Sequence, residues 1–163
     1  MMRPWSITLT AMAVALTLDQ GTSVRASIVE RPGAAPGEAV IALRLQPAGL
    51  ALGSYQGTMR FTPGSFVIVS AATPKGDGTR IVNVADSARG IVRFAGFTVS
   101  GFSSLDVLTL VVRPARKLDA ANLAAELDVA GDLNGVPVPR DHLVPARGIT
   151  QDPGKNQGNA HGA

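Results

Sequence analysis

The stretch SYQGTMRFTPGSF, residues 54–66, carries the strongest fold signal in the chain. Its first half alternates, with the larger apolar side chains Tyr55, Met59 and Phe61 on one face. The other face is polar and consists of Ser54, Gln56, Thr58 and Arg60. A period of two is typical of a β-strand with one buried and one solvated side. The stretch therefore predicts a half-buried strand that TPG interrupts, and it leaves open whether the polar face binds a partner or only meets solvent.

Short apolar runs separated by glycine and proline extend this pattern along the chain. The expected strands are residues 27–31, 38–47, 54–61, 66–72, 79–85, 91–99, 105–114, 123–131 and 136–138. Turn signals recur about every 8 to 12 residues, which is the spacing of an all-β sandwich or barrel. Residues 117–129 would also suit a short helix by propensity, but their β-rich surroundings favour a loop followed by a strand. The pattern predicts a single all-β domain.

The N-terminal 26 residues have the order of elements of a secretory signal peptide. Arg3 precedes an apolar run at residues 7–18, and the pattern VRA places cleavage after Ala26. The apolar run has 12 residues, whereas a membrane-spanning helix needs about 20. An uncleaved anchor or a buried core helix is the alternative. We expect an exported protein (periplasmic, extracellular or at the cell surface) with no membrane span after cleavage.

Export would leave a sandwich domain at residues 27–149 and a tail at residues 150–163. The tail has no apolar side chain beyond alanine and is expected to be disordered. Without residues 1–26 the chain has 13 basic and 11 acidic residues, and it has no cysteine for disulfides or thiolate metal sites. Its arginines are scattered, whereas nucleic-acid-binding proteins concentrate basic residues on one face. Nucleic acid is therefore not an expected partner.

The polar residues do not form a catalytic or metal-binding signature. His142 follows Asp141 in a proline-flanked loop, without the serine geometry of a hydrolase triad. The GDLNG turn lacks the oxygen ligands and the closing glutamate of a calcium loop. Other aspartates lie in predicted turns, where aspartate usually binds its own backbone. We expect no enzymatic activity, no metal site and no cofactor.

Aromatic residues are too few for a sugar-stacking platform, which needs exposed tryptophan or tyrosine rings. Trp5 lies in the predicted signal peptide, and Tyr55, which is the single tyrosine, is expected to face inward. A hydrogen-bonding cleft for a polysaccharide remains an alternative.

The order of motifs resembles that of the cohesin family. GLALGSYQGTMRFTPGSFVIV is similar to the early strands of a cohesin domain and their proline corner. GIVRFAGFTVSGF, LDVLTLVVRPAR and LDVAGDLNGVPV are similar to the later and closing strands. The corner has Thr62 where the family usually has aspartate. The resemblance implies a nine-stranded β-sandwich of jelly-roll topology, related to carbohydrate-binding modules. It also implies docking of a calcium-loaded dockerin on one flat sheet, without catalysis.

Carried over by position, the resemblance places the docking residues of the early strand at Ser54, Gln56 and Thr58. On the later strand Arg93 and Ala95 alternate with apolar residues and are expected to face outward. By the same reasoning, Arg60 and Arg80 are candidate contacts. The alternative for each is an ordinary solvated strand residue. The expected function is that of an exported adaptor for a dockerin-like protein; polysaccharide binding, or a structural role in an envelope or secretion complex, are the alternatives.

Overall fold

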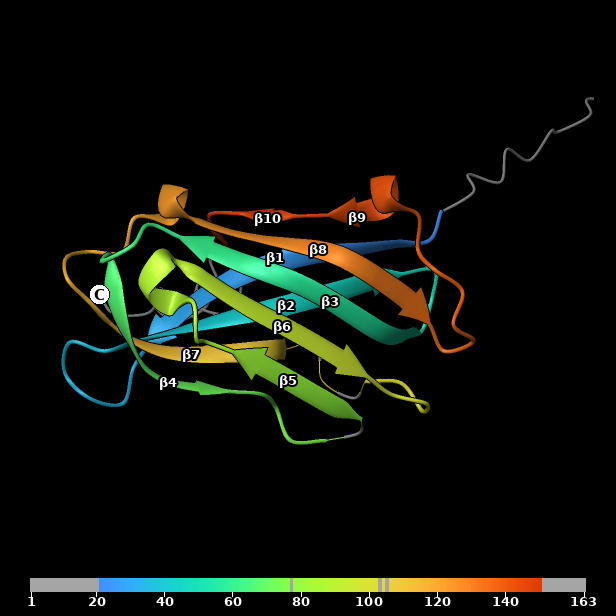
Figure 1. Cartoon of the computed structure of the whole chain (residues 1–163), viewed down its shortest axis with the longest axis horizontal. Helices are drawn as coiled ribbons and strands as arrows, with labels where there is room; N and C mark the ends of the chain where they lie inside the picture. The colour runs from blue at the N-terminus through green and yellow to red at the C-terminus, as the bar shows by residue number, and fades with distance from the viewer. Residues whose placement is uncertain (1–20, 77, 103, 105, 151–163) are drawn as a thin grey trace, which may run out of the picture.

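The computed structural model describes residues 21–150 except 77, 103 and 105, and in it the chain forms a two-layer β-sandwich (Figure 1). One sheet has the strand order β11-β1-β2-β7-β4, with β9 also beside β1, and the other has the order β10-β8-β3-β6-β5. The eight longer strands are β1 (Ser23–Pro32), β2 (Ala39–Ala48), β3 (Leu52–Phe61), β4 (Phe66–Ala72), β5 (Thr79–Asn83), β6 (Ile91–Phe97), β7 (Asp106–Pro114) and β8 (Leu123–Asp132). The expected all-β sandwich is confirmed.

The final part of the described chain closes one side of the sandwich. Its three two-residue strands are β9 (Leu143–Val144), β10 (Ala146–Arg147) and β11 (Ile149–Thr150). β9 and β11 pair with β1 in parallel, whereas β10 pairs with β8 in the other sheet. This stretch takes the place of the ninth strand that was expected at residues 136–138, where only an isolated bridge joins Pro137 to Gly131.

The core lies between the two sheets and comes from the inward residues of each strand. Tyr55, Met59 and Phe61 are all buried, as their alternation predicts. Opposite them, the central strands of the other sheet contribute Leu43 and Leu110, which have no exposed surface. The remaining connections include three short 3-10 helices, η1 (Ser87–Arg89), η2 (Ala120–Asn122) and η3 (Arg140–His142). Since η2 leads directly into β8, the loop-and-strand prediction for residues 117–129 is confirmed.

The ordered domain extends beyond both of its expected boundaries. β1 begins at Ser23, and Val24 and Ala26 are buried in the core, so the bond expected to be cleaved lies inside a strand. Thr150, expected in the tail, pairs with Val29. The rest of the predicted leader and tail, residues 1–20 and 151–163, lies outside the described residues, and cleavage itself remains a prediction.

β4 and β5 are the edge strands of the two sheets, and they run along the same side of the sandwich (lower side of Figure 1). Within the described part of the chain, none of the helices has the length and apolar character needed to cross a membrane.

Candidate functional site

The sheet that carries β8, β3, β6 and β5 presents a broad outer face, which is turned toward the viewer in Figure 1. Antiparallel register aligns its outward residues in rows across the strands. One row runs Ile81, Ala95, Gln56, Val129, and the next runs Asn83, Arg93, Thr58, Glu126. We call this surface the outer face of the second sheet.

The first of these rows carries two exposed large apolar side chains, Ile81 and Val129, with Ala95 and Gln56 between them; together with Phe97 we call them the apolar band. Ile81 of β5 is 60% exposed and Val129 of β8 is 55% exposed, although they lie at opposite sides of the sheet. Phe97 of β6, in the adjoining row, is 59% exposed. Large apolar side chains that share one face in this way are typical of a binding surface, whereas scattered single ones are not.

The neighbouring row contains charged side chains that already form ion pairs within the domain. Arg93 donates a hydrogen bond to Asp86, and Arg89 of η1 donates to the other oxygen of the same carboxylate. Hydrogen bonds from Arg89, and then from Arg93, hold the pKa of Asp86 below its ordinary value. Across the sheet, Arg147 Nη2 lies 3.5 Å from Glu126 Oε1. These pairs form a polar border beside the apolar band.

A shallow depression of about 180 Å³ lies between the two rows. Its lining includes Gln56, Thr58, Ile81, Asn83, Arg93, Ala95 and Asp128. The pairing of β3 with β8 shifts register between Gln56 and Gly57, and the extra residue on β8 is Asp128. Gly57 has no room for a side chain, because a Cβ there would lie 2.6 Å from Cζ of Phe94. The glycine therefore lets the Phe94 ring pack directly under the depression.

Six of the seven residues predicted as partner contacts lie on this face. Gln56, Arg60 and Arg93 are exposed, and the remaining three, Ser54, Thr58 and Ala95, are half-buried by their neighbours. Arg80 does not lie there, and its expected outward orientation is wrong. In the strand TRIVN, Arg80 and Val82 turn toward the core, whereas Ile81 turns outward. The Arg80 guanidinium lies over the Phe102 ring, with Cζ 4.8 Å from the ring centroid.

The sequence reasoning missed the apolar part of the face. Ile81, Phe97 and Val129 were read as parts of strands without an assigned side. Period two separates Ile81 from its neighbours Arg80 and Val82, but both sides of this strand contain an apolar residue. Extending the alternation of β6 by two residues predicts that Phe97 faces outward, because Arg93, Ala95 and Phe97 share one side of the strand.

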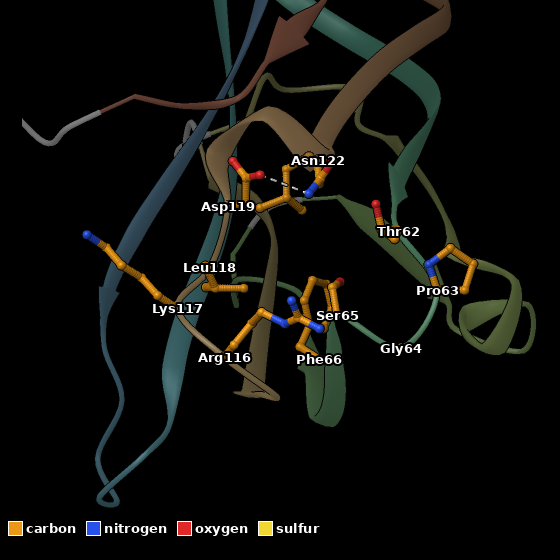
Figure 2. A pocket seen from close by; sticks show the side chains of 11 residues that line it. Thr62, Pro63, Gly64, Ser65, Phe66, Arg116, Lys117, Leu118, Asp119 and Asn122 are labelled. Atoms are coloured by element: carbon orange, nitrogen blue, oxygen red, sulfur yellow. Dashed lines mark hydrogen bonds between the residues drawn. The ribbon is translucent and has the colours of Figure 1, made fainter.

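A second hollow, of about 300 Å³, lies at the end of the sandwich where the β3–β4 corner meets the β7–β8 connection (Figure 2). Asp119 is the single carboxylate in its lining, which contains no histidine. Asp119 accepts hydrogen bonds from the Ala121 backbone N–H at 3.0 Å and from Asn122 Nδ2 at 3.1 Å. In Figure 2 the Lys117 side chain points away from the other labelled residues. With one carboxylate bound within its own turn, the hollow lacks a pair of groups for acid–base chemistry.

Potential metal ligands are dispersed. Among residues 21–150, apart from 77, 103 and 105, no three histidine, cysteine, aspartate or glutamate side chains gather closely enough to hold a metal ion. His142 Nε2 lies 3.8 Å from Oδ2 of the exposed Asp141. Among the described residues, the outer face of the second sheet is therefore the candidate functional site.

No protein-family model matches the sequence, and no curated protein matches it. Solved structures do. A cohesin module from a family 33 glycoside hydrolase of Clostridium perfringens matches with a TM-score of 0.55 at 11% identity, over 80% of this chain and 99% of that one. A type I cohesin–dockerin complex from Clostridium thermocellum gives a TM-score of 0.51 at 12% identity, over 78% and 99%. A non-cellulosomal cohesin from the archaeon Archaeoglobus fulgidus gives 0.52 at 11%, over 80% and 94%.

These similarities extend over most of each chain, but at identities this low they establish the fold alone. The chain has a cohesin-like β-sandwich fold, which confirms the resemblance seen in the sequence.

Proposed function

We propose that this chain, which has the fold of cohesin modules, is a non-catalytic docking domain that binds a protein partner through the outer face of its second sheet. The observation that carries the proposal is the apolar band of Ile81, Phe97 and Val129, which three strands expose on one face. An apolar centre with a polar border is the usual arrangement of a protein–protein interface.

The charges around the band restrict the chemistry of the partner. Arg60 is exposed and forms no ion pair among the described residues, whereas Arg93 is held by Asp86. A partner that places an apolar ridge over the band and a carboxylate near Arg60 would satisfy both features. A charged contact of this kind acts mainly on specificity and association rate, so most of the binding energy is expected from the band.

A dockerin-type partner is the first candidate. The fold is that of modules solved in cohesin–dockerin complexes, such as the Clostridium thermocellum complex. Docking there would make the chain an adaptor in a cell-surface or polysaccharide-associated assembly, and it would require export, which the predicted leader provides.

The test compares the capture of partner proteins by the wild-type chain and by three variants. Ile81→Asp and Val129→Asp place a carboxylate in the apolar band, and Val67→Asp is the matched control on β4, where Val67 is 70% exposed outside the band. We expect both band variants to weaken partner binding at least about tenfold, while the control binds as the wild type does. Equal binding by all three variants would contradict the proposed face.

A calcium chelator and insoluble polysaccharides complete the experiment. Loss of capture with the chelator is the result expected for a dockerin-type partner. Capture that is insensitive to calcium would exclude that partner class but keep protein docking. Direct retention of the pure chain on cellulose, xylan or chitin, unaffected by the band variants, would replace the proposal with polysaccharide binding.

A further inference from the structure

Arg80 lies on the inner side of β5, which is one of the two edge strands of the second sheet. β5 has five residues and, among the described strands, pairs with β6 alone, so few contacts hold it in place. Its inward residues are Arg80 and Val82, and its outward residues include Ile81 and Asn83. The position of Ile81 on the outer face therefore depends on how the inner side of β5 is attached to the rest of the domain.

Arg80 contacts three segments that are distant from one another in the sequence. Its guanidinium covers the ring of Phe102, in the β6–β7 connection, with Cζ 4.8 Å from the ring centroid. Its Nη1 donates a hydrogen bond to the carbonyl oxygen of Pro74, in the β4–β5 connection, at 3.2 Å. On β3, its charge lowers the pKa of the Tyr55 hydroxyl, although burial has the larger effect and raises that pKa to about 12. One side chain thus joins β5 to both flanking connections and to the centre of the sheet.

The same side chain is an unfavourable choice for stability alone. Its Nε and Nη2, which form the edge of the guanidinium that commonly binds a carboxylate, are buried and have no hydrogen-bond partner in the described part of the chain. The Tyr55 hydroxyl is also buried and makes no hydrogen bond of ordinary geometry to the described residues, and Arg80 is the group that acts on its pKa. Arg80 is half-buried as a whole, and burying part of a cation without a counter-charge among the described residues opposes folding, so that an apolar residue of similar size is often as good or better. Residues that depart from such a rule tend to mark functional positions.

The packing under β5 and β6 is tight enough to transmit a fixed position. The Tyr55 and Phe102 ring centroids are 5.1 Å apart. Gly96 of β6 leaves room for the Tyr55 ring, since a Cβ at this position would lie 2.3 Å from Tyr55 Cζ. Arg80 therefore rests on a closely packed layer, and its contacts there attach β5 to the inner side of the domain.

We propose that Arg80 is a positioning residue of the docking face, which fixes Ile81 and Asn83 for the partner by tying β5 to Phe102 and Pro74 from the inner side. The inference rests on the proposed docking function. Arg80 does not touch the partner; it acts through β5. An apolar residue at this position would fill the space but would lose the cation–π contact and the hydrogen bond to Pro74.

The first test needs no partner and measures amide hydrogen exchange across residues 79–83 in the full chain. Arg80→Met should speed exchange in β5 by about tenfold or more, with a melting temperature within about 2 °C of the wild type. Arg80→Lys, which keeps the charge without the planar guanidinium, should fall between the two. Phe102→Leu should also speed exchange in β5, although it lies in another segment. Arg116→Met, at the exposed end of the sandwich, is the control and should leave β5 unchanged.

Tyr55 supplies a spectroscopic readout that a general loss of stability would not produce. It is the single tyrosine of the chain, so the absorbance change near 295 nm on alkaline titration reports its ionisation alone. Because the Arg80 charge lowers the pKa of Tyr55, Arg80→Met should move this titration to higher pH. Arg80→Lys should move it less. Unchanged exchange in β5 together with an unchanged Tyr55 titration in Arg80→Met would overturn the inference.

Partner binding then separates this inference from the proposal on which it rests. Weaker binding by both Ile81→Asp and Arg80→Met supports both. In the Ile81→Asp background, Arg80→Met should cause little further loss, because Arg80 acts through the same strand. Binding that is lost in Ile81→Asp but intact in Arg80→Met overturns the positioning role and keeps the docking face. Binding that is intact in Ile81→Asp overturns β5 as part of the docking face, and the positioning role with it.

Discussion

The outer faces of the two sheets differ in where their ion pairs and their exposed apolar side chains lie. On the first sheet, charges pair across strands: Arg44 of β2 binds Asp106 of β7, and Arg113 of β7 binds Glu38, which directly precedes β2. Its strongly exposed large apolar residues, Val67 and Val69, are confined to the edge strand β4.

On the second sheet, exposed large apolar residues lie on β5, β6 and β8, and the ion pairs stand at the border. Paired charges satisfy a face by themselves, whereas an apolar band spread over several strands is satisfied only when a partner covers it. The comparison supports the second face, rather than the first, as the proposed docking face.

The largest effect is expected from removing the start of β1. A chain that begins at residue 27 lacks Ser23–Ala26, and so loses buried Val24, four paired positions on β2 and the β1 partner of β9. Burial of one valine contributes about 2 kcal/mol, and the lost pairing adds to it. Urea denaturation should show residues 27–163 to be less stable than residues 21–163 by at least this amount. Equal stability would mean that the first four residues of β1 do not hold the first sheet together.

Alkaline pH should weaken the layer beneath the docking face. The pKa of Tyr55 is about 12 in the folded chain and 10.0 ordinarily, because burial disfavours the charged phenolate. A raised pKa means that the neutral form is preferred in the folded state. The contribution of neutral Tyr55 to the free energy of unfolding is therefore complete below pH 10 and is lost as the pH rises toward 12. Thermal melts should show a fall in melting temperature between about pH 10 and 12 that exceeds the fall in Tyr55→Phe. An identical decline in both chains would show that Tyr55 is not the group responsible.

The smallest effect concerns the polar border of the proposed docking face. Arg89 and Arg93 share the Asp86 carboxylate, and the bond from Arg89 is the larger cause of its lowered pKa. Arg89→Gln should therefore raise the pKa of Asp86 more than Arg93→Gln does, as measured by carboxyl NMR titration. Since the group is exposed, neither change should alter the melting temperature measurably. The reverse order of the two shifts would show that Arg93 is the dominant partner.

Most of the fold could be predicted because the local sequence pattern of each strand is enough to identify it. Residues 66–72 form β4 with the expected bounds, and the alternation of residues 54–61 assigns Tyr55, Met59 and Phe61 to the core. β1 begins at Ser23, four residues before the expected start of the domain, because a cleavage pattern and a strand are both compatible with SVRA. Local pattern does not reveal that Val24 pairs with Pro47 and with Leu143 far along the chain.

The candidate site was predicted in part. Gln56, Thr58 and Arg93 do share one face, because period two on β3 and β6 fixes their side once the core residues are known. The apolar band was not foreseen, since it requires β5, β6, β3 and β8 to be neighbours in one sheet. Strand order depends on long-range pairing, which local periodicity does not contain.

By itself, the sequence determined the class of fold, the bounds of most strands and the inward side of β3, because alternation and turn residues act over a few positions. Tertiary structure alone decided which side of the strand TRIVN, residues 79–83, faces the core. Both of its sides carry an apolar residue, so periodicity could not choose between them. The neighbouring Phe102 ring and the Pro74 carbonyl, each from another segment, contact Arg80 on the inner side and leave Ile81 exposed on the outer face.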